Sequence, residues 1–167
     1  MALTQYCELD EVRAALGVNE VELPSAVLSL PVYEIGLVRE LSKISASLPA
    51  AFSTVLAIPL VSRTADQKAF FDAARLFCVY ACARQVGVSL GAMAPKSVGD
   101  GKASLSRFSD SPYKDVLARV DAMCSGAREN LAEAYGTLTS STAAVASTVP
   151  ATAFRPSTRA TDVVTGT

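Results

Sequence analysis

Residues 65–90, with the sequence ADQKAFFDAARLFCVYACARQVGVSL, are apolar on more than one side and decide the fold. Two apolar stripes follow helical spacing: Phe70, Ala74, Phe77 and Ala81, and Ala69, Ala73, Leu76, Tyr80 and Ala83. Lys68, Asp72 and Arg75, spaced i, i+4 and i+7, form one narrow charged strip. A helix that is apolar on two sides needs a neighbour on each. We therefore predict a helix here that lies at the centre of a bundle or against another subunit.

The segment before this helix contains three shorter predicted helices. Residues 8–16 have an acidic first turn and are followed by Gly17, which favours a helix end. After a connector with one helical turn behind Pro24, a second helix is expected over residues 31–47. Its predicted apolar face consists of Val32, Ile35, Val38, Leu41 and Ile44. A short helix over residues 49–56 should end before Pro59.

The segment after it contains a loop, a long helix and an arm. Residues 91–108 hold three polar or glycine positions in a row, Gly99 to Gly101, and predict an exposed loop or a short hairpin. Apolar spacing then predicts a helix over residues 112–138. Ser111 is expected to be its N-cap and Pro112 its first residue, and Gly136 indicates that the helix ends nearby. Residues 139–167 are rich in Ser, Thr and Ala, bury too little apolar surface to fold alone, and are expected to be an extended arm.

The predicted fold class is thus all-α. We expect a small bundle of about four main helices in residues 1–138, with the exposed loop before the last long helix, and the arm as a separate unit over residues 139–167. No apolar run is long enough to span a bilayer, and no signal sequence opens the chain, so the protein should stay in the cytoplasm where it is made.

Composition argues against an enzyme. The chain has no histidine, which removes the commonest general base and every His-containing zinc site. Its four cysteines lack CxxC spacing and mostly fall in apolar helical patterns, so buried free thiols are expected rather than disulfides or metal ligands. Fifteen basic residues nearly balance sixteen acidic ones, so any contact with DNA should be transient and non-specific. No catalytic residue, metal site or cofactor is predicted.

Two motifs resemble functional sites but lack residues that those sites need. Gly101 and Lys102 resemble the end of a phosphate-binding loop, but Ala103 stands where that loop needs Ser or Thr, and Lys96 replaces its first glycine. Cys78 and Cys82 are spaced to share a metal ion, yet no further Cys or His lies at ligand spacing. Core packing explains the two cysteines better.

Two groups of residues are the candidate contact sites. The loop residues are candidates for a DNA channel or a tail protein, with an ordinary solvated loop as the alternative: Lys96, Asp100, Lys102, Arg107 and Phe108. The arm residues combine apolar anchors with basic side chains, as a peptide that docks in a groove does, with a plain linker as the alternative: Phe154, Arg155, Pro156, Arg159, Val163 and Val164.

Three segments resemble the bacteriophage head–tail connector proteins, also called adaptor or head-completion proteins. YCELDEVRAALGV at residues 6–18 resembles the first helix of that family. LPAAF at residues 48–52 and the helix over residues 70–86 are similar to its central helices. APKSVGDGK at residues 94–102, with Arg107 and Phe108, resembles its exposed loop.

The resemblance implies a structural protein of the virion at the head–tail interface. Such subunits form a ring, usually of twelve, beneath the portal protein, and extended segments grip the portal and the next tail or nozzle protein around the DNA channel. Portal binding is accordingly expected of the arm residues. Two alternatives remain from the residues alone. One is a non-virion helical adaptor or regulatory subunit that binds a partner through its tail. The other is a cofactor-dependent or thiol-based enzyme that uses Cys7 or the pair Cys78 and Cys82.

Overall fold

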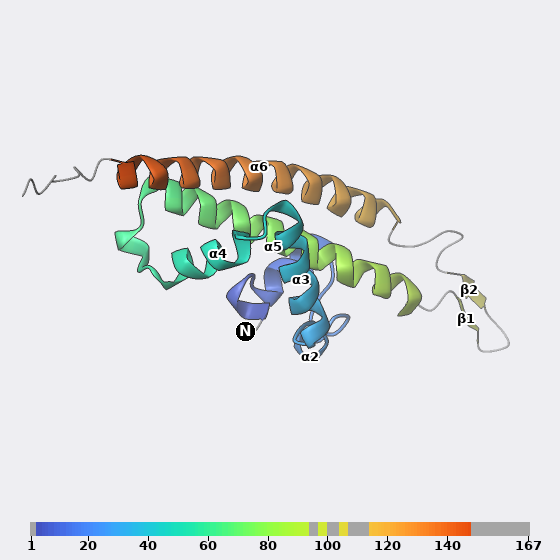
Figure 1. Ribbon diagram of the computed structural model, residues 1–167. Coiled ribbons are helices and arrows are strands. Elements are labelled where there is room, and N and C mark those ends of the chain that lie inside the picture. Colours follow the sequence, from blue (N-terminus) through green and yellow to red (C-terminus); the bar gives the residue numbers. More distant parts are fainter. Residues whose placement is uncertain (1–2, 94–96, 100–103, 107–113, 148–167) are drawn as a thin grey trace, which may run out of the picture.

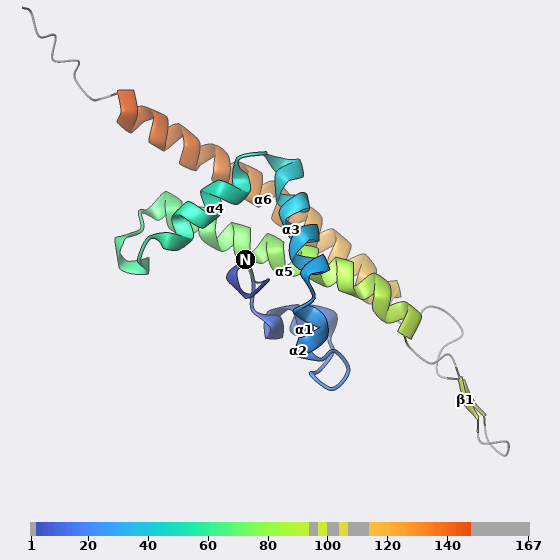
Figure 2. The same ribbon diagram turned by 60° about the horizontal axis from the view of Figure 1, so that its bottom comes forward.

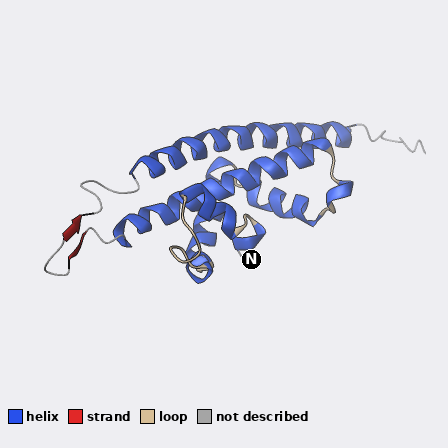
Figure 3. Cartoon of the chain, turned by 180° about the vertical axis from the view of Figure 1, so that it is seen from behind, coloured by secondary structure: helices blue, strands red, loops and turns tan. Residues whose placement is uncertain are grey.

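The computed structural model describes residues 3–93, 97–99, 104–106 and 114–147, and its fold is all-α apart from one small hairpin (Figures 1 and 3). The α-helices are α1 (Leu9–Leu16), α2 (Ser25–Leu28), α3 (Pro31–Ile44), α4 (Leu48–Ala57), α5 (Ala65–Met93) and α6 (Lys114–Ser147). Two short 3-10 turns are η1 (Leu3–Gln5) and η2 (Leu60–Ser62), and the strands are β1 (Ser97–Gly99) and β2 (Ser104–Ser106). No helix within these ranges is long and apolar enough to cross a membrane.

Helix α5 lies at the centre of the bundle, as its two apolar sides predicted. Helix α6 runs antiparallel beside it along most of its length, and α1, α3 and α4 pack on its other sides (Figures 1 and 2). The first predicted stripe is fully buried, with Phe70 and Phe77 in the largest core positions. From α6, Leu131 reaches the same core, and the Tyr135 ring lies 5.8 Å from that of Phe70.

An aromatic stack joins the N-terminus and α4 to α5. The Phe52 ring of α4 lies between Tyr6 and Phe71, at centroid distances of 5.3 Å and 5.4 Å. The guanidinium of Arg63 covers the outer face of Phe71 at 4.1 Å. Arg63 also donates hydrogen bonds to the carbonyls of Leu56 and Ile58, which closes the C-terminal end of α4. One stack therefore fixes three segments that are distant in sequence.

A buried arginine holds α1 to the connector that follows it. Helix α1 ends at Gly17, whose φ of 69° favours glycine. The chain then turns back, and Arg13 donates hydrogen bonds to the Leu23 carbonyl at 2.9 Å, the Ser25 hydroxyl at 2.5 Å and Asp10 at 2.5 Å. Its side chain is only 7% exposed, so these partners replace the water that the guanidinium gives up.

Replacing Arg13 by methionine should therefore lower the free energy of unfolding by about 1–3 kcal/mol, because the Leu23 carbonyl loses its donor while much of the apolar stem remains. Urea unfolding followed by circular dichroism measures this loss. Arg128→Met is the matched control, since Arg128 is exposed on α6, and its effect should stay within about 0.5 kcal/mol. Equal midpoints for the two variants would contradict the role given to Arg13.

Most predicted helices are confirmed, with three corrections. On α3 the predicted apolar face is rotated: Leu37 and Leu41 are buried, whereas Val32 and Ile35 are 62% and 67% exposed. On α5 the second stripe is only partly covered, and Leu76 is 46% exposed. Residues 91–93 belong to α5 rather than to the loop, and a hairpin follows in which Val98 pairs with Leu105.

A further correction concerns the end of the last helix. The predicted end near Gly136 is wrong, because α6 continues to Ser147. Thr139 and Ser140 donate their hydroxyl hydrogens to the Tyr135 and Gly136 carbonyls of the same helix, so these polar side chains are satisfied without leaving it. One glycine costs a helix only about 1 kcal/mol. Ser111 and Pro112, predicted to begin this helix, lie outside the described residues.

Candidate functional site: an apolar groove

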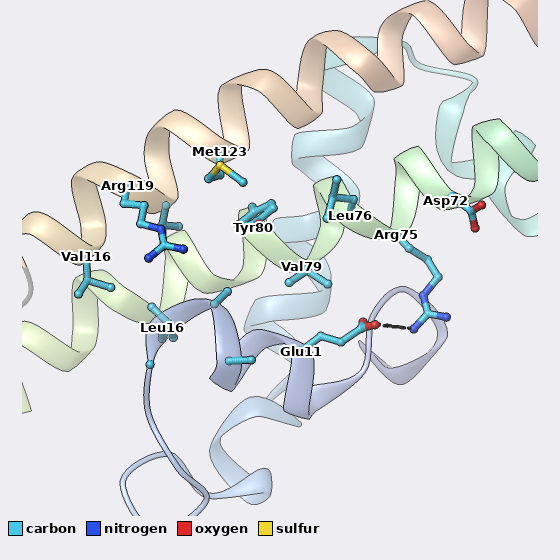
Figure 4. A pocket seen from close by; sticks show the side chains of 14 residues that line it. Glu11, Leu16, Asp72, Arg75, Leu76, Val79, Tyr80, Val116, Arg119 and Met123 are labelled. Carbon is cyan, nitrogen blue, oxygen red and sulfur yellow. Dashed lines mark hydrogen bonds and ion pairs between the residues drawn. The ribbon is translucent and has the colours of Figure 1, made fainter.

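An open groove of about 630 Å³ lies where α1, α5 and α6 meet (Figure 4). Helix α5 forms its floor with Leu76, Val79 and Tyr80, and α6 lines one side with Val116, Val120 and Met123. Ala14, Ala15 and Leu16 of α1 line the opposite side. Leu76 and Met123 are 46% and 45% exposed, so apolar side chains of the floor and of one wall face solvent.

The groove is the gap between α1 and α6 where both helices lie on α5. It runs along most of α1, because its lining includes α1-side residues from Glu11 to Gly17, α5 residues from Asp72 to Tyr80 and α6 residues from Val116 to Met123. At one end, Leu16 and Leu117 pack over Gly87, whose lack of a side chain makes room for both.

The rim of the groove is charged. The Arg75 guanidinium lies 3.3 Å from a Glu8 carboxylate oxygen and 3.2 Å from one of Glu11. Burial would lower the pKa of Arg75, but the Glu11 and Glu8 carboxylates outweigh that effect and raise it. Asp72 lies along the same rim, and Arg119 stands on the α6 side (Figure 4). An apolar floor between charged rims is typical of a protein-binding surface.

The four cysteines are buried free thiols, as predicted. A hydrogen bond between the Cys7 and Cys82 thiols, together with burial, raises the pKa of Cys7, and burial is the main cause that raises the pKa of Cys78 and Cys124. Raised pKa values keep these three side chains as neutral thiols, whereas nucleophilic or metal-binding cysteines are thiolates. Within the described ranges no group of three Cys, Asp or Glu side chains is arranged to hold a metal ion.

The structure does not describe the sequence-predicted contact residues. The loop residues Lys96, Asp100, Lys102, Arg107 and Phe108, and the arm residues from Phe154 to Val164, fall outside the part of the chain that the structure describes.

The groove itself was missed by sequence reasoning, although the sequence contains a signal for it. Lys68 and Asp72 are charged positions one helical turn apart on α5, and Leu76 lies one turn after Asp72. An apolar residue therefore continues a row of charged residues that face solvent. An exposed apolar position at the end of a charged row indicates a surface that something else covers. On α6, Met123 follows the apolar spacing of the helix, yet its side chain is 45% exposed.

Comparisons of the chain with protein families, with curated proteins and with solved structures found no match.

Proposed function

We propose that this chain is a structural adaptor of a bacteriophage head–tail connector. It forms a ring beneath the portal protein and links the portal to tail proteins around the DNA channel. The observation that carries the proposal is the groove, because an apolar floor open to solvent is the mark of a surface made for association. The kind of assembly, a ring beneath the portal, is suggested by the resemblance to head–tail connector proteins. That resemblance is found in residues 6–18, 48–52, 70–86 and 94–102.

Apolar side chains also face solvent on two further surfaces. The α3 face consists of Leu30, Val32 and Ile35, which are 48%, 62% and 67% exposed. The second surface is on η2, the turn between α4 and α5, and is called the α4–α5 end. It consists of Leu60 and Val61, which are 66% and 92% exposed. A ring subunit needs two different lateral surfaces and at least one axial surface, and three separate apolar surfaces fit that need.

The α4–α5 end is the proposed axial surface toward the portal. The C-terminal end of α6 points toward the same end of the bundle (Figures 1 and 2). Residues 148–167 follow directly from that end of α6, so the arm and the exposed η2 residues would reach the same partner. Phe154, Arg155, Pro156, Arg159, Val163 and Val164 remain the proposed portal contacts within the arm.

The chemistry of the core agrees with a structural role. Cys7, Cys78 and Cys124 have raised pKa values and offer no thiolate for covalent catalysis. With a net charge of −1, the protein would not hold the phosphates of passing DNA tightly. Neither a cofactor nor a resident metal is part of the proposal.

Mixing the protein with the portal protein encoded in the same genome tests the proposal. We expect a co-sedimenting, ring-shaped complex by electron microscopy. A variant that lacks residues 148–167 should keep the circular dichroism spectrum and unfolding midpoint of the full chain, because the described core residues end before that segment, but it should lose portal binding. A monomer or dimer that never joins the portal ring would instead favour a non-virion adaptor and refute the connector proposal.

A further inference from the structure

The groove and the α3 face lie on different sides of the central helix. In Figure 4 the groove opens toward the reader between α1 and α6, while α3 lies behind α5. One subunit therefore presents a hollow apolar surface on one side and a convex apolar surface on another. We propose that the groove of one subunit receives the α3 face of the next, head to tail, which makes this contact the subunit interface of the ring. The inference rests on the proposed function and names the partner of the groove, a second copy of the chain.

The α3 face has the residue spacing of a helix that lies in a groove. Val32 and Ile35 are spaced i, i+3 and point outward from the same face of α3, as the anchors of a helix that lies in a groove do. Leu30 extends the apolar edge just before the helix begins at Pro31. The groove of about 630 Å³ is within the size of pockets that enclose several side chains or a small ligand.

The charges of the two surfaces match. Arg39 follows Ile35 by one turn on the exposed side of α3. Asp72 stands exposed on the groove rim, next to the Leu76 floor. Among the described residues, neither Arg39 nor Asp72 has an ion-pair partner within its own chain. With Val32 and Ile35 over Leu76 and Met123, Arg39 of one subunit would face Asp72 of the next.

The arrangement determines the kind of assembly. A twofold dimer uses the same surface on both subunits, whereas here each contact joins two different surfaces and leaves one of each free. Such contacts continue until the chain of subunits closes, and closure by rotation gives a ring.

Two complementary variants test this interface. V32E/I35E places two carboxylates on the α3 face, and L76E/M123E places two carboxylates in the groove. All four side chains are at least 45% exposed, so both variants should fold. We expect each variant alone to be monomeric by light scattering, with self-association weakened at least about 30-fold. An equimolar mixture should form a 1:1 heterodimer and nothing larger, because only one intact groove and one intact α3 face remain per pair. Val21→Glu, at a position 90% exposed in the α1–α2 connector, should assemble like the wild type.

Several results would overturn the inference. If V32E/I35E still dimerises while L76E/M123E does not, the groove pairs with itself through a twofold axis. A wild-type protein that stays monomeric across the whole concentration series, or a mixture that forms no heterodimer, would also refute it. A portal-bound ring in the earlier experiment, together with a failed mixture here, would leave the connector function standing and reject only this interface.

A charge-reversal pair tests the register of the contact. Asp72→Arg should weaken assembly because it places two cations together, and adding Arg39→Glu should restore it. Failure of the second change to restore assembly would mean that Arg39 and Asp72 do not meet.

Discussion

Replacing Phe52 by alanine is expected to remove about 3–5 kcal/mol of the stability of this domain. The Phe52 side chain is 1% exposed, and its ring is stacked between those of Tyr6 and Phe71. Alanine would leave a cavity there and separate η1 and α4 from α5 at the same time. Domains of this size are stable by only about 5–15 kcal/mol, so the loss is a large share of the total. Urea unfolding followed by circular dichroism measures it.

Two further substitutions serve as comparisons for the loss of stability in Phe52→Ala. Phe52→Leu keeps most of the buried apolar volume and should cost less than Phe52→Ala, since volume-conserving changes are tolerated best. Val61→Ala, at a side chain that is 92% exposed, should change stability by no more than about 0.5 kcal/mol. If all three variants unfolded at the same urea concentration as the wild type, the aromatic stack would not hold the N-terminus and α4 to α5.

The central helix was predictable because its apolar residues leave few choices. Phe70, Ala74, Phe77 and Ala81 repeat at helical spacing over about three turns, and all four are fully or almost fully buried. Each apolar face of a helix needs a neighbour that covers it. The spacing of the apolar residues therefore predicts both the helix and its central place in the bundle. Gly17 was equally informative, because a glycine after an apolar helix favours the left-handed conformation that ends it.

The exposed face of α3 was not predictable in the same way. Val32, Ile35 and Val38 share a face with Leu41, while Leu37 and Leu41 share the neighbouring one, so two apolar faces fit the sequence about equally. Packing against α5 selected the second face. Periodicity indicates that a helix is amphipathic, but it cannot tell a side that faces the core from one that faces another molecule.

The groove depends on a further property that a single sequence does not contain. Its floor residues Leu76, Val79 and Tyr80 belong to a helix that is apolar almost all round, so the positions of α1 and α6 beside α5 decide which of them is covered. Apolar spacing predicts the helices, but it does not predict how large a gap two helices leave where they pack on a third. The candidate residues chosen from sequence, such as Lys102 and Phe154, were selected for chemical type rather than for position in a surface.

Stability should fall steeply as the pH rises above 9. Burial and the hydrogen bond between Cys7 and Cys82 raise the pKa values of Cys7, Cys78 and Cys124 above the 9.0 of an ordinary thiol. Below pH 9 the folded and unfolded chains both keep these protons, so the three thiols add no pH dependence. Above pH 9 the unfolded chain releases them while the folded chain keeps them. The unfolded state therefore gains stability with pH, by at most about 1.4 kcal/mol per pH unit for each thiol while the pH lies between its unfolded and its folded pKa.

The measurement is the free energy of unfolding in urea at half-unit steps from pH 8 to pH 11, with a reducing agent present so that no disulfide forms. Cys124→Ala is the control that separates thiol ionisation from packing. Its lost volume should lower the stability at every pH by the same amount, whereas its missing thiol should make the alkaline slope shallower. Tyrosine and lysine side chains contribute equally to both proteins and cancel in the difference. Parallel curves for the wild type and Cys124→Ala would mean that Cys124 ionises as readily in the folded chain as in the unfolded one.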